Sequence, residues 1–259
     1  MDFLSKKYFR TIVPPNIWDF GRYLKFLIFK NSNFAAHNMD RKLQKYLNYN
    51  YGFFVDVGAN DGFTESNTLF LERKRTWRGV LIEPLPNQFI NCCYYRGRKG
   101  NSFFPNACVS FENKKKTMQI QYANLMSVLV TKNNALKSIE DHLISGRQHL
   151  IEGTGKLEFG VYVKTLNKIL NESKAPKIID FMSIDVEGSE MEILKGINFK
   201  EYKFKYILIE CRNFKKINNF LIKRNYKFIK KLSTHDYLFA FEIKKNLPYK
   251  YFNFLGKKL

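Results

Sequence analysis

The sequence contains little that marks a secreted or membrane-spanning protein. It has only four cysteines among 259 residues, and none has the paired spacing of a zinc site. Met1–Arg10 lacks the apolar segment of a secretory signal. The longest early apolar stretch, near Leu24–Phe29, is far shorter than the ~20 residues that a membrane-spanning helix requires. We therefore expect a cytoplasmic protein without a transmembrane segment, whose only contact with a membrane would be peripheral.

Acidic residues are also scarce, because 23 of them stand against 44 basic residues and leave a net charge of +21. An anionic surface, an acidic glycan or a nucleic acid would attract such a chain. Alternatively, an A+T-rich genome favours Lys, Asn, Ile, Phe and Tyr codons together, and all five residues are abundant here. The basic residues are scattered and form no arginine-rich helix, so the sequence disfavours a dedicated nucleic-acid module.

Short apolar runs that alternate with helical stretches predict an α/β fold. Such runs suit strands buried on both faces of a parallel sheet. The alternation indicates βαβ units in one mostly parallel, doubly wound sheet, closed by a C-terminal antiparallel hairpin. The predicted strands are Phe53–Val57, Gly79–Ile82, Ile178–Ile184 and Tyr206–Ile209, with hairpin strands at Tyr226–Leu232 and Tyr237–Ile243. The predicted helices are Thr64–Arg73, Asn87–Arg96, Val163–Leu170 and Ser189–Leu194.

We expect three parts along the chain: a helical N-terminal extension at residues 1–50, a main domain at 51–245 and a basic tail at 246–259. Within the main domain, residues 131–160 are polar and contain several glycines. Long loops of this kind are often lids or binding loops, although a disordered insertion has the same composition. We expect the histidines of this segment, His142 and His149, at the surface rather than against a substrate.

The most informative stretch is a strand followed by an acid and a glycine-rich turn, Phe54-Val55-Asp56-Val57-Gly58-Ala59-Asn60-Asp61-Gly62. Gly58 and Gly62 have no Cβ atom, so the backbone can turn sharply and a ligand can approach closely. The turn lacks the Gly-x-Gly-x-x-Gly spacing of a dinucleotide site, and the chain has no Gly-x-x-x-x-Gly-Lys-Ser/Thr loop for a triphosphate. Asp56 and Asp61 would repel a phosphate but suit the sulfonium and ammonium groups of S-adenosylmethionine.

A second acid, Glu83, follows the next predicted strand and can accept hydrogen bonds from both hydroxyls of a ribose. Its spacing from Asp56 fits strand, turn, helix, turn and strand. Both acids therefore belong at the carboxyl edge of the sheet, where ligands bind in open α/β folds.

Four further residues complete the predicted cofactor site from their positions alone. Asn60 in the glycine turn can approach the methionine end of the cofactor. Asn106 and Ala107, around the third strand, are placed for contact with adenine. Ser127, after a predicted strand at Thr117–Tyr122, is placed for the pocket wall.

These stretches resemble the FkbM family of methyltransferases. The resemblance is carried by Phe54–Gly62, by Ile82-Glu83-Pro84 and by Ile184-Asp185-Val186-Glu187-Gly188-Ser189-Glu190, with support from Thr165-Leu166 and Leu194-Lys195-Gly196. It covers about residue 53 to residue 243, and the Asp-Val-Glu-Gly-x-Glu segment discriminates most. The resemblance implies a class I, Rossmann-like methyltransferase fold. It also implies methyl transfer from S-adenosylmethionine, usually to a hydroxyl of a sugar, glycan or natural product.

A sugar hydroxyl is a weak nucleophile, so its methylation depends on positioning and gains from a general base. Asp185, after the strand predicted at Ile178–Ile184, is the first candidate for the base or substrate role, and Glu187 is the next. His235, between the hairpin strands, can reach the same edge, although a lone histidine in a turn is often simply exposed. Asp185, Glu187 and Glu210 could hold Mg²⁺ or Mn²⁺, but three acids at strand ends do not establish a metal site, and none is predicted.

The favoured function is O-methylation of a sugar, glycan or related small molecule. Methylation of an RNA ribose stays open on the charge alone. Base N-methylation is disfavoured, because the Asn/Asp-Pro-Pro-aromatic motif is replaced by Asp185-Val186-Glu187-Gly188. The third hypothesis is a methyltransferase-like scaffold that binds a partner without catalysis. The glycine turn and Glu83 are intact, which argues against a decayed cofactor site.

Overall fold

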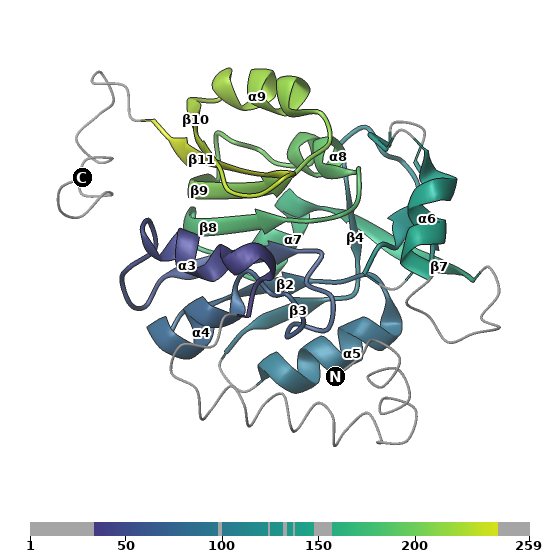
Figure 1. Ribbon diagram of the computed structural model, residues 1–259, viewed down its shortest axis with the longest axis horizontal. Helices are drawn as coiled ribbons and strands as arrows, with labels where there is room; N and C mark the ends of the chain where they lie inside the picture. The colour runs from purple at the N-terminus through teal and green to yellow at the C-terminus, as the bar shows by residue number, and fades with distance from the viewer. Residues whose placement is uncertain are drawn as a thin grey trace, which may run out of the picture.

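A seven-stranded sheet forms the centre of the protein. The computed structural model describes residues 34–242, apart from 98–99, 124, 132–133, 137 and 148–156. The strand order is β10-β11-β9-β8-β1-β2-β3 (Figure 1). Strands β9, β8, β1, β2 and β3 run parallel, and β11 and β10 close the sheet as an antiparallel hairpin. The strands are β1 (Phe53–Val57), β2 (Arg78–Ile82), β3 (Ser102–Phe104), β8 (Ile178–Ile184), β9 (Lys203–Glu210), β10 (Tyr226–Lys231) and β11 (Asp236–Phe241).

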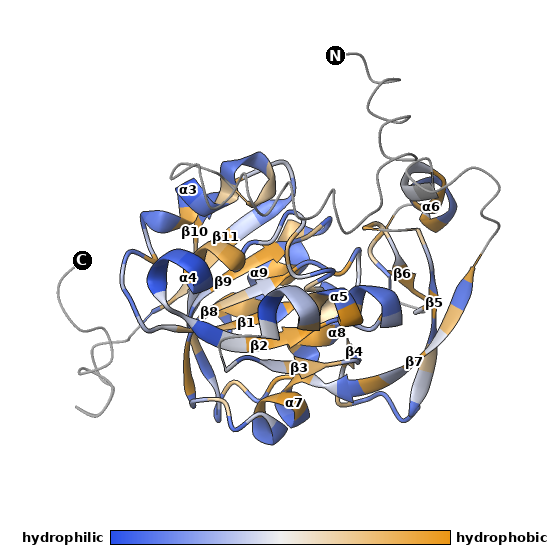
Figure 2. Ribbon diagram, turned by 90° about the horizontal axis from the view of Figure 1, so that it is seen from below, coloured by the Kyte–Doolittle hydropathy of each residue, from blue (hydrophilic) through white to orange (hydrophobic). Residues whose placement is uncertain are grey.

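Helices cover both faces of this sheet (Figures 1 and 2). Alternate residues of β1 show the division, because Val55 and Val57 pack into one core cluster and Phe54 into the other. The first cluster includes residues of α7 (Leu166–Glu172), α8 (Glu190–Lys195) and α9 (Phe214–Ile222). The second includes residues of α3 (Met39–Gln44), α4 (Leu69–Arg75) and α5 (Pro86–Arg96). The predicted α/β fold, a mostly parallel doubly wound sheet with a C-terminal antiparallel hairpin, is confirmed.

A second, smaller sheet lies beside the main one and was not predicted as a separate sheet. Its order is β4-β7-β5-β6, and α6 (Ile139–Arg147) lies near it at the same end of the molecule (Figure 2). Apolar residues from β4, β5, β6 and β7 form a separate core with Leu85. Leu143 of α6 packs with Ala123 and Val128. The strands are β4 (Ala107–Val109), β5 (Thr117–Gln121), β6 (Val128–Leu129) and β7 (Glu158–Thr165).

Two predicted helices begin later than expected. Residues 163–165 of the helix predicted at Val163–Leu170 belong to β7, and α7 starts only after Thr165. The Thr165 hydroxyl accepts a hydrogen bond from the Lys168 amide and caps the helix, which explains the boundary. The helix predicted at Thr64–Arg73 begins at Leu69, because side-chain hydrogen bonds to backbone amides hold the preceding residues in a loop.

Only part of the predicted N-terminal extension lies within the described residues. Residues 1–33 lie outside them, as do residues 243–259 with the predicted basic tail. Residues 34–50 contain a 3₁₀ turn, η1 (Ala36–Asn38), and α3. Met39, Leu43 and Leu47 are buried against Trp77, so this part is packed onto the sheet as core. No helix within the described ranges is long and apolar enough to cross a membrane.

Candidate functional site

The glycine turn after β1 brings the ends of three strands together. The Gly58 and Ala59 amides both donate hydrogen bonds to the Ile82 carbonyl, each at 3.0 Å. Gly58 has a φ of +86°, and a Cβ atom there would lie 1.8 Å from the carbonyl oxygen of Asp185. Only glycine permits this approach between the ends of β1 and β8. The turn therefore fixes the carboxyl edge at the switch point of the sheet, between β1 and β8.

Glu83 is held at this edge by two backbone amides. Its Oε2 atom accepts a hydrogen bond from the Asn60 amide and its Oε1 atom one from the Leu85 amide, both at 2.9 Å. Burial raises the pKa of Glu83 to about 7, against the effect of these two hydrogen bonds. Each carboxylate oxygen has a second acceptor site, so Glu83 can still receive two hydroxyl donors from a ligand.

Glu83 opens into a narrow cavity that we call the apolar crevice. Its volume is about 80 Å³. Gly58 and Asn60 line it, together with Asn106, Ala107 and Ser127. The structure thus brings six of the eight predicted cofactor residues together. Asn106 and Ala107 do not belong to the third strand of the main sheet, however, because Ala107 opens β4 of the second sheet. Apolar side chains complete the lining: Val57, Ile82, Leu85, Ile120, Leu125, Leu129, Val186 and Ile193.

The other two predicted cofactor residues, Asp56 and Gly62, do not line the crevice. Asp56 accepts a 2.6 Å hydrogen bond from the Thr68 hydroxyl, which in turn accepts one from the buried Arg96. Gly62 packs against Arg96 and Cys92, where a Cβ atom would come within 2.9 Å of either side chain. Through these contacts around Arg96, Asp56 and Gly62 stabilise the packing of the fold and do not form part of the crevice wall. Asp61 likewise accepts hydrogen bonds from the amides of residues 63 and 64 and stabilises the turn.

A second cavity adjoins the crevice, and we call it the acidic chamber. Its volume is about 410 Å³. Gly58, Asn60, Leu125, Asp185 and Glu187 line both cavities, so the two meet at the end of β8. His37 and His235 also line the chamber. Its acidic lining consists of Asp56, Glu65, Asp185, Glu187, Glu210 and Asp236.

The carboxylates of the chamber strongly influence one another. The Asp185 side chain faces the chamber and is surrounded by protein. Desolvation by this surrounding protein is the largest cause that raises the pKa of Asp185 well above the ordinary value, and the charge of Glu210 is the next. Burial also raises the pKa of Asp236, although the Ser233 hydroxyl donates a hydrogen bond to it. Arg212 is the cation close to this group, with its Nη2 atom 3.4 Å from Glu210 Oε1 and 3.6 Å from Glu187 Oε2. The chamber therefore has a mainly acidic lining although the whole chain is basic.

Residues 56–238 match the family model described as the methyltransferase FkbM domain, which is more than half of the chain. The protein belongs to the FkbM methyltransferase family. The resemblance drawn from the motifs is thereby confirmed, and the chain is a methyltransferase. A search of curated proteins found no match.

Several solved methyltransferase structures are similar to this FkbM protein at low identity. A methyltransferase from Geobacter sulfurreducens is 9% identical, with a TM-score of 0.43 over 94% of this chain and 98% of that chain. A methyltransferase from Pyrococcus furiosus is 13% identical, with a TM-score of 0.37 over 78% and 80%. M. capricolum TrmK, in complex with S-adenosyl-homocysteine, is 12% identical, with a TM-score of 0.37 over 82% and 73%. At these scores the likenesses carry nothing about substrate.

The described part of segment 131–160 docks onto the loop after β8 in this methyltransferase. Asn134 donates a hydrogen bond to the Glu187 carbonyl at 3.2 Å, and the Ala135 amide donates one to the Gly188 carbonyl at 2.9 Å. The His142 Nε2 atom lies 3.2 Å from Glu187 Oε2, and the His142 side chain is only 8% exposed. The prediction that His142 lies at the surface is therefore wrong. His149 lies outside the described residues.

Sequence reasoning missed much of the chamber wall. His37 belongs to η1 and Glu65 to the loop before α4. No motif links these two positions, and only the fold brings them together. Asp236, next to the predicted His235, lines the chamber from the start of β11. Arg212 follows Glu210 closely after the strand predicted at Tyr206–Ile209, and the structure places its side chain beside Glu210 and Glu187. The three predicted catalytic residues, Asp185, Glu187 and His235, all line the chamber.

Proposed function

We propose that this methyltransferase transfers the methyl group of S-adenosylmethionine to a hydroxyl of a sugar, glycan or related small molecule. One observation carries the proposal: the apolar crevice and the acidic chamber meet at Asp185 and Glu187. A donor in the crevice would face an acceptor in the chamber across this junction. Methyl transfer needs little more than such alignment, because the sulfonium already provides a good leaving group.

The chemical character of the crevice residues suits the donor. Glu83 would accept hydrogen bonds from both ribose hydroxyls, and Asn106 with Ala107 would contact the adenine. Gly58 and Asn60 leave backbone room for the methionine portion. When bound, S-adenosylmethionine supplies an electrophilic methyl group. Leu125, Ser127 and Leu129 form part of the crevice wall that the donor would contact.

The chamber suits a neutral, hydroxyl-rich acceptor. Carboxylates accept hydrogen bonds from hydroxyl groups. Asp185 lines both cavities and is placed to take the proton as the acceptor oxygen bonds to the methyl carbon and the carbon–sulfur bond breaks. Glu187 lies beside it as the second candidate. His235 is on the hairpin side of the chamber, where it can contact the acceptor.

The same chamber disfavours the RNA alternative. An RNA ribose in the chamber would bring its flanking phosphates toward a group of carboxylates. The charged groups of an acidic glycan would likewise have to stay outside the chamber. A scaffold that binds a partner without catalysis would not explain why two cavities adjoin, or why most of the residues that line both are polar.

A cytoplasmic location accompanies this proposal. The four cysteines are free thiols, and Cys92, Cys108 and Cys211 are buried. Reduced thiols are the rule in that compartment. Contact of this basic chain with an anionic surface or an acidic glycan stays a separate prediction.

The test has two stages on the purified full-length protein. Calorimetry with S-adenosylmethionine and S-adenosyl-homocysteine should show binding, and no heat with either would contradict the donor assignment. A screen with the labelled donor against neutral glycans, lipid-linked sugars and RNA should then label a neutral hydroxyl acceptor. Labelling of RNA alone, with an affinity that falls steeply with salt, would replace the proposal with the RNA alternative.

A further inference from the structure

The backbone at Glu187 adopts a conformation that residues other than glycine rarely take. Glu187 has a φ of +51°, and Gly188 after it has a φ of +95°. A non-glycine residue in the left-handed region is strained, and it persists only where the surrounding structure holds it. Glu187 also lines both the crevice and the chamber. The strained residue therefore lies at the junction where the donor and the acceptor would meet.

The segment before α6 holds this strained backbone. Asn134 donates a hydrogen bond from Nδ2 to the Glu187 carbonyl at 3.2 Å, and the Ala135 amide donates one to the Gly188 carbonyl at 2.9 Å. Asn134 Oδ1 accepts a hydrogen bond from the Leu136 amide at 2.8 Å, so both ends of the side-chain amide are engaged. A Cβ atom at Gly188 would lie 2.2 Å from Asn134 Oδ1. The two segments therefore approach as closely as the glycine allows.

His142 of α6 holds the side chain of Glu187. Its Nε2 atom lies 3.2 Å from Glu187 Oε2, and the imidazole is 8% exposed. Both atoms are enclosed, and neither has a hydrogen-bond partner elsewhere within the described residues. Two enclosed lone pairs would repel, so the contact is favourable only when Nε2 carries a proton. Arg212 approaches the same Oε2 atom at 3.6 Å. Oε2 is thus surrounded by protein groups, and Oε1 is left for a ligand.

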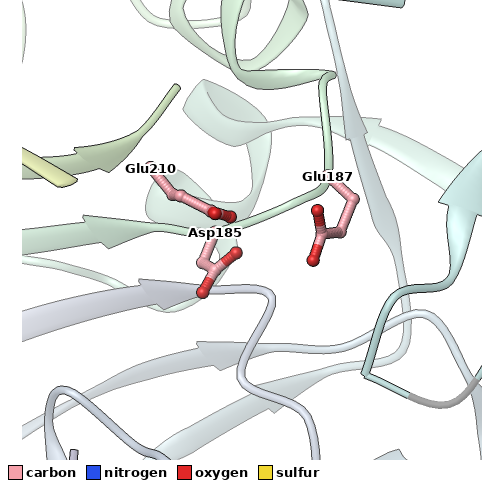
Figure 3. A group of neighbouring side chains, drawn as sticks. All are labelled: Asp185, Glu187 and Glu210. Carbon is pink, nitrogen blue, oxygen red and sulfur yellow. The ribbon is translucent and has the colours of Figure 1, made fainter. Parts of the chain in front are cut away.

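The Glu187 carboxylate held in this way faces Asp185. Figure 3 shows Asp185 and Glu210 side by side at the ends of neighbouring strands, with Glu187 facing them from the loop after β8. One oxygen of Glu187 lies within 4.8 Å of one oxygen of Asp185. Two carboxylates at such a separation can accept hydrogen bonds from two hydroxyls of one molecule. If Asp185 takes the proton of the methylated hydroxyl, Glu187 is placed for a neighbouring one.

We propose that Asn134 and His142 are positioning residues that hold Glu187 so that its carboxylate binds a hydroxyl adjacent to the one that is methylated. The inference rests on the proposed function and deepens it, because it names the acceptor class: a sugar with two neighbouring free hydroxyls. A hydroxyl that donates to a carboxylate makes a strong, charge-assisted hydrogen bond. Asn134 and His142 select the acceptor through Glu187, whose backbone and side chain they fix.

The first experiment examines His142 and needs no acceptor. The chain has four histidines, so the full-length protein labelled at histidine nitrogens gives a simple long-range proton–nitrogen correlation spectrum. The His142 signal is identified by its absence in His142→Gln. Near neutral pH, His142 should carry a proton on Nε2, and Glu187→Gln should shift its resonances. A His142 protonated on Nδ1 alone could not donate to Glu187, and this result would overturn the inference.

The second experiment compares the acceptor that the screen identifies with its deoxy analogue, which lacks the neighbouring hydroxyl. For the wild type, loss of this hydroxyl should lower kcat/KM at least about tenfold. His142→Leu should show a similar loss with the complete acceptor and little further loss with the deoxy analogue. His142→Gln keeps an N–H donor and should restore most of the activity. A purely structural role would not produce this dependence on one hydroxyl.

The backbone contact has a matched pair of variants. Asn134→Asp keeps the acceptor for the Leu136 amide but loses the donor to the Glu187 carbonyl, so it should behave like His142→Leu. Asn113→Asp is the control, because this exposed asparagine makes the same kind of hydrogen bonds to Lys115 in another loop. The control should keep the wild-type kcat/KM with both acceptors. Circular dichroism verifies the fold of each variant.

The outcomes separate this inference from the proposed function. Additive losses from His142→Leu and from the missing hydroxyl would overturn the inference, as would equal activity of the wild type with both acceptors. Calorimetry of the wild type with S-adenosyl-homocysteine reports on the donor site alone. Donor binding together with an unprotonated Nε2 would remove only the positioning role. Absence of donor binding and of any labelled acceptor would contradict the proposed function, and the state of His142 would still be decided by its spectrum.

Discussion

The apolar crevice and the acidic chamber differ in how the chain builds them. The crevice lies within residues 57–193 and is shaped by the turn after β1, by Glu83 and by the second sheet. The chamber collects residues from η1, the loop before α4, the ends of β8 and β9, and the turn between β10 and β11. Glu83 is the carboxylate that belongs to the crevice alone, whose lining is mainly apolar, whereas six carboxylates line the chamber and two of them, Asp185 and Glu187, are shared by both cavities. On the proposed function, the sheet and its glycine turn would bind the donor, and the elements added around them would select the acceptor.

Asp185→Asn should impair the function of the chamber and leave donor binding in the crevice intact. We expect turnover to fall about 10²–10⁴-fold with the acceptor that the screen identifies, because the amide cannot take the proton. The donor dissociation constant should change by less than about twofold. Steady-state kinetics and calorimetry measure the two effects. The control is Asp141→Asn, an exposed acid on α6. Full activity of Asp185→Asn would exclude Asp185 as the base.

Gly58→Ala should damage both cavities together. The new Cβ atom would collide with the Asp185 carbonyl at 1.8 Å, and a φ of +86° strains any L-residue. We expect a loss of roughly 2–4 kcal/mol of folding stability and at least about tenfold in donor affinity. Gly97→Ala is the matched control, because a Cβ atom there would meet nothing within 4 Å. Thermal denaturation that shows equal stability of both variants would contradict the close approach.

Glu83→Ala should weaken the crevice and spare the chamber. Loss of two charge-assisted hydrogen bonds predicts a donor affinity lower by roughly 1–3 kcal/mol, or about 5- to 150-fold. Removal of the carboxylate also leaves the Asn60 and Leu85 amides without their acceptor. Calorimetry with S-adenosyl-homocysteine provides the measurement, with Glu112→Ala as the control. Unchanged affinity would displace Glu83 from the ribose.

The pH dependence of donor binding also tests the assignment of Glu83 to the ribose. Burial raises the pKa of Glu83 to about 7, and the nearby Asp56 and Asp61 add to this effect. Ribose hydroxyls donate to the ionised form, so donor affinity should fall by up to about tenfold per pH unit below 7 and stay flat above it. In the protein without donor, the effect of pH on folding stability has the opposite sign. The stability that protonated Glu83 contributes is complete below its ordinary pKa of 4.5 and is lost as the pH rises through about 7. A flat binding profile from pH 5 to 8 would contradict the assignment.

His37→Ala should have the smallest effect, confined to the chamber. His37 lines the chamber from η1 and is absent from the crevice lining. We expect the acceptor KM to rise by about threefold, since one wall contact is lost, while the donor affinity stays constant. Kinetics at saturating donor test this. A change in donor affinity larger than in acceptor KM would show that the two cavities are not separable.

Local patterns in the sequence were sufficient for six of the seven strands of the main sheet, all except β3, and for most of the crevice. The runs that form β1, β2, β8 and β9 are apolar and flanked by turns, and the glycine turn has a mandatory geometry at Gly58. Glu83 was found because an acid at the end of the next parallel strand must lie at the same edge. The second sheet was missed because β4 has three residues and β6 only two, too few for an alternating pattern to register.

The sequence alone determined the doubly wound sheet, the FkbM motifs and the carboxyl edge where ligands bind, because strand periodicity and glycine geometry are local properties. Only the tertiary structure decided which side chains meet at that edge. It placed Asp56 against Thr68 and brought His37 and Asp236 into the chamber. It also buried His142 beside Glu187. Those contacts join residues far apart in the chain, and they depend on how separate elements pack rather than on any spacing within one of them.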